Sequence, residues 1–103
     1  MSILRDINEI PQYEPEHPGE MLAEIIDELS GLTQGKVAES IGVSTRTINL
    51  ICNKHRAVTP EMALKLGKLF NQSPQFWLNM QQAYDLWVAR QKTNLEIIKS
   101  IAG

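Results

Sequence analysis

One segment, TQGKVAESIGVSTRTINLICN at residues 33–53, constrains the fold more than any other part of the sequence. It places a small residue, Ala38, four positions before Gly42. A small side chain allows two helices to cross closely, and glycine adopts the left-handed conformation that a tight turn between them requires. The spacing therefore predicts two short helices that pack at a steep angle. We expect the wedge between them to contain the aliphatic side chains Val37, Ile41, Val43, Ile48 and Ile51.

This is the spacing of a helix-turn-helix, and its second helix has a polar face. At about 100° per residue, Ile48 and Ile51 fall on the side opposite that face. In the DNA major groove, arginine pairs with guanine, asparagine with adenine, and an aliphatic group contacts the thymine methyl. Ordinary solvated residues of an amphipathic helix are the alternative interpretation. Given the preceding helix and turn, we predict contacts to bases from Thr45, Arg46, Asn49 and Leu50.

Polar and basic residues flank the predicted base-contacting face and are candidates for contacts to phosphates. Gln34 stands at the start of the first helix, where a helix N-terminus attracts an anion. Lys54 and Arg56 follow the second helix, where they also compensate the helix dipole. The predicted phosphate-contacting set is Gln34, Ser44, Thr47, Asn53, Lys54 and Arg56.

Charge is distributed unevenly along the chain, although the formal net charge is only −2. Residues 1–32 contain eight acidic residues and one basic residue, and so carry −7. Residues 33–58 contain four basic residues and one acidic residue, and so carry +3. A local basic block can meet phosphates in an acidic protein. The acidic front suggests a second, basic partner, or else a solvated acidic face that maintains solubility.

Capping signals predict helices throughout, with starts at Pro18, Thr33, Ser44, Thr59–Pro60 and Ser73–Pro74 and ends at Ser30–Gly31 and Gly42. Thr93–Glu96 is predicted to be a capping box that restarts a helix through Ile101, so that one bent helix or two follow Ser73. No segment alternates polar and apolar residues as a half-buried strand does. We therefore predict an all-α fold of about five helices. Its predicted parts are an N-terminal arm at residues 1–16, a helix-turn-helix domain at 17–90 and a C-terminal helical extension at 91–103.

Composition excludes several classes of function for these 103 residues. A single cysteine, Cys52, excludes an internal disulfide and indicates a reducing, cytoplasmic compartment. Two histidines far apart in sequence provide too few ligands for zinc, and no histidine is placed to activate Cys52. No apolar run approaches the length of about 20 residues that a membrane span requires. We expect no cofactor, no metal, no membrane association and no enzymatic activity.

Four blocks of the sequence resemble a known family. They are HPGEML at residues 17–22, LTQGKVAESIGVSTRTINLICN at 32–53, the VTPEMALKLGKLF run that follows, and SPQFWLNMQQAYDL at 73–86. Over about residues 17–88 the chain resembles HigA-type antitoxins, which belong to the Cro/C1-repressor-type helix-turn-helix superfamily. The resemblance implies a five-helix, lambda-repressor-like DNA-binding domain. It also implies an antitoxin of a type II toxin–antitoxin module that represses the promoter it shares with its toxin.

The resemblance also implies partners and roles for individual residues. The partner is a small basic HigB-type toxin, a RelE-like ribonuclease that cleaves messenger RNA. Gln34 corresponds to a phosphate-clamping glutamine, while Thr47 and Asn53 contact the DNA backbone. The base contacts fall on Thr45, Arg46, Asn49 and Leu50. The chain has Asn-Lys-His-Arg at residues 53–56, where the family often has Asn-Gly-Lys-Arg.

Apolar residues near both ends indicate protein partners. The aromatic block Phe76, Trp77, Met80 and Tyr84 is predicted to close the core. Beyond it, Trp87, Leu95, Ile98 and Ile101 are predicted to form an exposed stripe that serves a homodimer or, alternatively, the toxin. The acidic arm is a second candidate for toxin binding, with Ile3, Leu4, Ile7, Ile10 and Tyr13 as apolar anchors.

Two other functions are compatible with a helix-turn-helix. One is a stand-alone Cro-like repressor without a toxin, which a neighbouring reading frame for a short basic protein would argue against. The other is a protein–protein adaptor that has lost contact with DNA. The polar set on the second helix and the local charge of +3 disfavour the adaptor.

Overall fold

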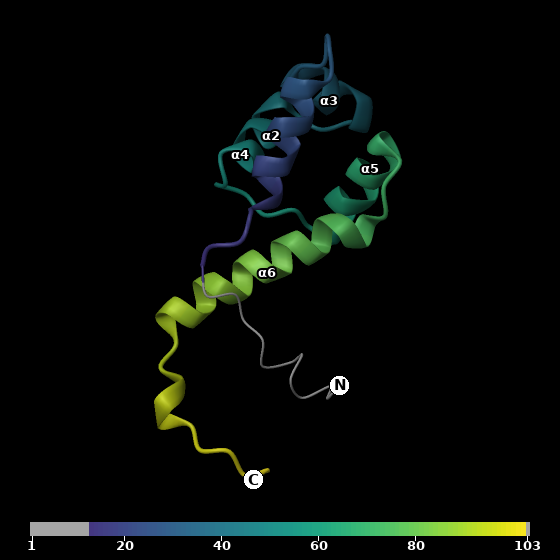
Figure 1. Ribbon diagram of the computed structural model, residues 1–103. Helices are drawn as coiled ribbons and strands as arrows, with labels where there is room; N and C mark the ends of the chain where they lie inside the picture. The colour runs from purple at the N-terminus through teal and green to yellow at the C-terminus, as the bar shows by residue number, and fades with distance from the viewer. Residues whose placement is uncertain (1–12, 103) are drawn as a thin grey trace.

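The computed structural model describes residues 13–102, and all regular structure in that range is helical. The elements are α2 (Pro18–Glu28), α3 (Gln34–Ile41), α4 (Thr45–Cys52), α5 (Pro60–Phe70), α6 (Pro74–Lys92) and the 3-10 turn η1 (Leu95–Ile97). Helices α2 to α5 form one body, and α6 runs away from it toward the C-terminus (Figure 1). The predicted all-α fold of about five helices is confirmed. None of the helices in this range is long and apolar enough to cross a membrane.

Local caps set the helix starts, as the sequence predicts. The side chains of Thr33, Ser44 and Thr59 each accept a hydrogen bond from the backbone N–H three residues later. These bonds satisfy N–H groups that have no partner within the helix. Gly42 ends α3 with a φ of 73°, the left-handed conformation predicted for the turn.

The start of α2 is held by a cap that the sequence does not suggest. Pro18 occupies the first turn as predicted, and buried His17 is the N-cap. The His17 Nδ1 accepts from Gly19 N at 2.9 Å, and His17 N donates to Glu20 Oε1 at 3.3 Å. The imidazole packs edge-on against the Tyr84 ring with centroids 4.8 Å apart. The cap therefore joins α2 to α6 as well as starting a helix.

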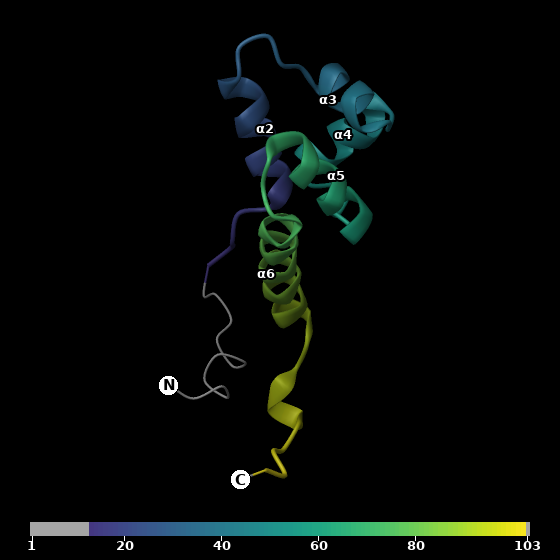
Figure 2. The same cartoon turned by 90° about the vertical axis from the view of Figure 1, so that its right-hand side faces the viewer.

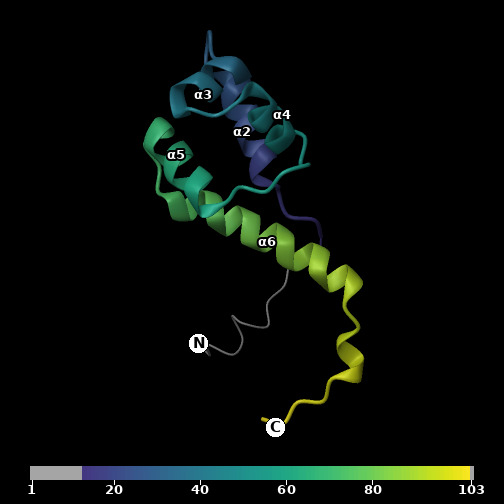
Figure 3. The same ribbon diagram turned by 180° about the vertical axis from the view of Figure 1, so that it is seen from behind.

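The core contains the residues that the helix-turn-helix pattern places in the wedge. Val37, Ile48 and Ile51 are fully buried, whereas Ile41 and Val43 are half-buried. From α6, Trp77 is fully buried, and Phe76 packs edge-on against it while remaining partly exposed. Figure 2 and Figure 3 show α6 leaving this body with only its first part beside the other helices.

The helix predicted to restart at Thr93 is limited to one 3-10 turn. Helix α6 is continuous to Lys92, and Asn94, not Thr93, caps the turn that follows by accepting from Glu96 N at 3.1 Å. Ile98 and Ile101 are exposed and contribute nothing to the core. A short segment gains little from helix propensity alone and depends on packing of an apolar face. The predicted helix through Ile101 is therefore absent because no surface of the described chain covers these isoleucines.

Candidate nucleic-acid interface

Helices α3 and α4 form the crossing pair that the sequence predicts. Ala38 lies buried where the helices approach, and its carbonyl accepts from Val43 N at 3.0 Å across the turn. A Cβ at Gly35 would lie 3.9 Å from Thr45 Oγ1, so the first turns of the two helices are in near contact. This crossing fixes the orientation of α4 relative to the rest of the domain.

The two sides of α4 differ as predicted. Ile48 and Ile51 are fully buried, while Thr45, Arg46 and Asn49 are exposed and Leu50 is half-buried. Among the described residues, Arg46 has no hydrogen-bond or ion-pair partner. Its guanidinium is therefore available to a ligand.

A hydrogen-bond chain joins α3 to the exposed face of α4. Asn49 Nδ2 donates to Gln34 Oε1 at 3.2 Å, and Asn53 Nδ2 donates to Asn49 Oδ1 at 3.3 Å and to Asn49 O at 3.0 Å. The oxygen of the Gln34 amide therefore accepts an intramolecular hydrogen bond. Its N–H groups, at the N-terminus of α3, stay available to an anion.

A second cluster surrounds the start of α4. Ser44 Oγ lies 2.9 Å from Thr47 Oγ1, and Arg56 Nη1 donates to Thr47 Oγ1 at 3.3 Å. Arg56 belongs to the loop after α4, so its side chain reaches back along the helix. The structure thus brings Ser44, Thr47 and Arg56 together, all of them predicted phosphate contacts.

Lys54 lies apart from that cluster. Its Nζ is 3.6 Å from Glu14 Oε2 and 3.6 Å from Glu20 Oε1, and these carboxylates raise the pKa of the lysine. Lys54 also has a φ of 65°, a left-handed conformation that favours glycine. Its place in the sequence is that of the glycine in the family's Asn-Gly-Lys-Arg loop.

Gln81 of α6 is a polar residue of this region that the sequence patterns do not single out. Its Oε1 accepts from the buried Val58 N at 2.8 Å, and its Nε2 donates to Asp85 Oδ1 at 2.9 Å. The available signal is its position, four residues after Trp77 and three before Tyr84 on the core stripe of the helix. A polar residue on a buried stripe needs a partner, and here the partner is the loop after α4.

The residues predicted to contact partners, at the C-terminal end and in the N-terminal arm, differ in how far they are exposed. Trp87 is half-buried, with its ring 6.5 Å from that of Tyr84. Leu95 lines a hollow of about 150 Å³ with Leu86, whereas Ile98 and Ile101 are exposed. Tyr13 is exposed, and the other predicted anchors of the arm, Ile3, Leu4, Ile7 and Ile10, lie outside the described residues.

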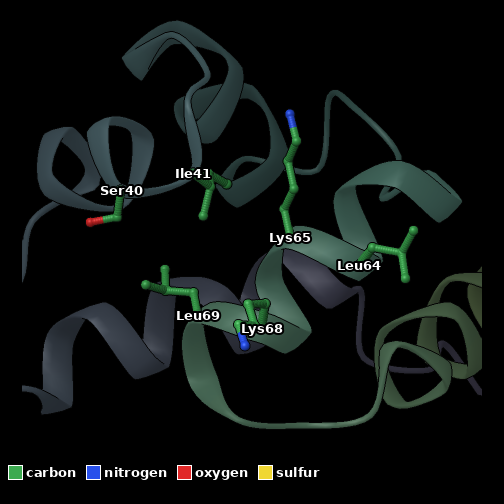
Figure 4. Close-up of a pocket in the computed structure, with 6 residues that line it drawn as sticks. All are labelled: Ser40, Ile41, Leu64, Lys65, Lys68 and Leu69. Carbon is green, nitrogen blue, oxygen red and sulfur yellow. The ribbon is translucent and has the colours of Figure 1, made fainter.

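Two further features bear on chemistry. Burial raises the pKa of the half-buried Cys52 thiol, which disfavours the reactive thiolate. A hollow of about 510 Å³ between α3 and α5 has an apolar lining with two lysines (Figure 4) and includes none of the predicted DNA contacts. Its lining residues are Ser40, Ile41, Leu64, Lys65, Lys68 and Leu69. Within residues 13–102 no group of acidic, histidine or cysteine side chains is placed to hold a metal ion.

Comparison with known proteins gives one consistent result. A family model described as Helix-turn-helix matches residues 22–77. Virulence-associated protein I of Dichelobacter nodosus is 41% identical over 99 residues, covering 95% of this chain and 89% of the relative. An addiction module antidote protein of the HigA family from Coxiella burnetii superposes with a TM-score of 0.80 at 36% identity, over 85% of this chain and 98% of that structure.

A second solved structure, Pseudomonas aeruginosa antitoxin HigA with the higBA promoter, has a TM-score of 0.78 at 32% identity. It covers 85% of this chain, which covers 99% of that structure. The family model spans more than half of the described chain, and these relatives match along nearly their whole length. The chain therefore belongs to the helix-turn-helix family, in the branch of the HigA-type antitoxins.

Proposed function

We propose that this protein is an antitoxin that binds its own operator and represses transcription, with α4 entering the DNA major groove. The observation that carries the proposal is the exposed polar face of α4, flanked by prearranged hydrogen-bond donors at both ends. The HigA of Pseudomonas aeruginosa is a structural relative that is seen with promoter DNA. Neither observation depends on the other.

The base contacts come from the exposed face of α4. Arg46 offers a bidentate fork that suits guanine, and Asn49 suits adenine. Asn49 Nδ2 has two protons and donates only one of them to Gln34, so its other amide proton stays available to a base. Thr45 and Leu50 complete the contacting surface. Because Gln34 and Asn53 hold the Asn49 side chain before DNA arrives, binding loses less side-chain entropy.

The phosphate contacts come from the two ends of the same surface. Gln34 donates from the N-terminus of α3, where the helix dipole also favours an anion. Ser44, Thr47 and Arg56 form one cluster at the start of α4, and Asn53 lies at its end. Lys54 joins the phosphate contacts once it separates from Glu14 and Glu20.

Operator binding is proposed to use a homodimer. Two-fold symmetry places two recognition helices about 34 Å apart on a palindromic site. The surface proposed for the dimer is the apolar stretch toward the C-terminus, which comprises half-buried Trp87 and exposed Leu95, Ile98 and Ile101. Contact with the toxin is the alternative use of that surface.

The toxin is proposed to be a small basic ribonuclease of the HigB type, bound at the acidic front of the chain. Burial raises the pKa of Glu16, and the nearby carboxylates of Glu24 and Glu20 raise it further. These two neighbours show that acidic groups lie close together there. A cationic partner relieves this repulsion. Deletion of residues 1–16 tests the site: toxin affinity falls if the arm binds toxin, and unchanged affinity refutes this part of the proposal.

Gel shifts on the upstream DNA of the protein's own gene test the proposed function. We expect a retarded band on that fragment, no equal band on a scrambled fragment of the same length, and a steep decrease in affinity with salt. Absence of the band at low ionic strength, with the toxin present and absent, refutes the proposal. A neighbouring reading frame that encodes a short basic protein separates the antitoxin from a stand-alone repressor.

A further inference from the structure

Gln81 is buried and connects helix α6, which leads to the proposed partner surface, with the loop after α4, which carries the proposed phosphate contact Arg56. It lies on the part of α6 that packs in the domain, and its Oε1 accepts from Val58 N at 2.8 Å. Val58 is itself 2% exposed although it belongs to a loop. The loop between α4 and α5, residues 53–59, is therefore held by a side chain from α6 at Val58, directly before the cap of α5.

The same loop is fastened at both ends by its own backbone and caps. At its start, His55 N donates to Leu50 O at 2.8 Å and Lys54 N donates to Ile51 O at 3.0 Å. At its end, Thr59 caps α5. Between these points only the Gln81 bond holds Val58 N, among the hydrogen bonds of the described chain. Arg56, which bonds to Thr47 at the start of α4, lies two residues from that bond.

We propose that Gln81 is a positioning residue for the DNA interface, which acts by holding Val58 and thereby the reach of Arg56 across α4. A buried N–H without an acceptor is unfavourable, so removal of the Gln81 oxygen drives Val58 toward solvent or another acceptor. A shift of Val58 moves the Arg56 backbone and breaks the hydrogen bond between Arg56 and Thr47. The inference rests on the proposed function, because it assigns to Arg56 an interaction with phosphate.

Asp85 orients the glutamine for this task. The Asp85 carboxylate accepts from Gln81 Nε2 at 2.9 Å and so directs Oε1, not Nε2, at Val58. Asp85 is exposed and Gln81 is buried, so the pair extends from the surface to the loop. For operator binding, this arrangement predicts that the exact side chains at positions 81 and 85 matter less than two hydrogen bonds: position 81 must accept from Val58 N, and positions 81 and 85 must bond to each other.

Five variants of the full chain test the proposal by operator binding at several salt concentrations, and one of them combines Gln81→Met with Arg56→Ala. Gln81→Met removes the acceptor at similar volume, and Gln82→Met makes the same chemical change at the exposed neighbouring position. Arg56→Ala removes the side chain that is proposed to bind phosphate. The double exchange Gln81→Glu with Asp85→Asn keeps an acceptor at position 81 for Val58 N. It also keeps a hydrogen bond between positions 81 and 85, now donated by the amide at position 85, and leaves the net charge unchanged.

Log affinity falls with log salt, and its slope is negative. We expect Gln81→Met and Arg56→Ala to make this slope less steep to the same extent, by about 0.9 for each phosphate that the protein no longer neutralises. Combining them weakens binding no further than Arg56→Ala alone, within about twofold, because both act on the same phosphate interaction. The double exchange restores the slope, and Gln82→Met leaves it unchanged. A purely structural role for Gln81 would lower thermal stability without changing the slope.

The outcomes separate this inference from the proposed function. A wild-type slope in folded Gln81→Met, or effects of Gln81→Met and Arg56→Ala that add, overturns the inference while operator binding stands. If the wild-type protein does not bind the operator fragment at all, the proposed function fails. If Gln81→Met does not fold, Asp85→Ala decides, because it frees the glutamine amide to turn. Since it also removes one negative charge, its slope is compared with that of Asp27→Ala, which removes an exposed carboxylate on α2. A slope shallower than that of Asp27→Ala supports the inference, and an equal slope overturns it.

Discussion

The contact between α2 and α4 leads to a large expected effect from adding one methyl group. A Cβ at Gly19 would collide with the carbonyl oxygen of Ile51, the buried residue near the end of α4, and would lie 3.0 Å from His17 Nδ1. The obstructing atom belongs to the backbone, so no change of rotamer relieves the clash. Helix α2 must move away from α4, and the His17 cap moves with it.

The magnitude of this effect follows from two contributions. Overpacking of a buried site costs about 1–3 kcal/mol, and loss of an N-cap costs about 1 kcal/mol. We therefore expect Gly19→Ala to lower the free energy of unfolding by about 2–4 kcal/mol. For a domain of this size the thermal midpoint then falls by roughly 10–20 °C. Urea and thermal unfolding, followed by far-ultraviolet circular dichroism, measure both quantities.

Gly35→Ala is the matched control, because the same substitution there meets no clash. The nearest atoms to a Cβ at Gly35 are 3.8 and 3.9 Å away, which is ordinary van der Waals separation. Since alanine favours helix over glycine, this variant should be as stable as the wild type or more stable, by up to about 1 kcal/mol. The reasoning about the crossing of α2 and α4 is refuted if Gly19→Ala unfolds within roughly 0.5 kcal/mol of the wild type, which is the usual effect of a surface substitution.

Three further predictions concern the site and its charges. Arg46→Ala should lose about 1–3 kcal/mol of operator affinity and relax the preference at one base pair, as measured by competition with operator variants; an equal loss on random DNA would show that Arg46 contacts only phosphate. Glu14→Gln should strengthen DNA binding at low salt, because it removes a carboxylate that holds Lys54, and the gain should vanish at high salt; a gain that persists in high salt contradicts this account. Burial lowers the pKa of His17 in the folded state, so the unfolded chain binds the proton first as the pH falls. The contribution of neutral His17 to stability is therefore complete above pH about 6.5. It is lost as the pH falls through the lowered folded-state pKa. Unfolding free energies from pH 8 to 5 should therefore fall more in the wild type than in His17→Asn, which caps without titrating, and parallel curves would exclude His17 as the cause.

Features that depend on neighbours in sequence were predictable. The caps at Thr33, Ser44 and Thr59 each involve a side chain and a backbone group three residues away, so local chemistry decides them. The buried side of α4 follows from helical periodicity, which a dozen residues suffice to show. Gly42 is similar, since the turn between two helices needs a left-handed residue wherever the helices lie.

Features that depend on distant partners were not predictable. The hydrogen bonds of the His17 cap are local, but the packing of its imidazole against the Tyr84 ring is not, and nothing near residue 17 indicates that contact. The pairing of Lys54 with Glu14 and Glu20 likewise requires α2 and the end of α4 to meet. The helix expected after Thr93 has a plausible local start, but it lacks a surface on which to pack its isoleucines.

Helix α6 connects the proposed DNA interface to the proposed partner surface. Its first part contributes buried Trp77 and Gln81 to the domain, whereas its last turns carry exposed Leu86 and lead to Leu95. Because α6 is continuous, we predict that a protein bound at its far end changes the environment of Val58 through Gln81. Linkage then requires the reverse effect: if a partner on α6 alters operator affinity, operator DNA alters affinity for that partner by the same factor. Measuring both affinities in Gln81→Met, where this connection is cut, should show the two ligands binding independently, whereas undiminished coupling would place its origin elsewhere in the fold.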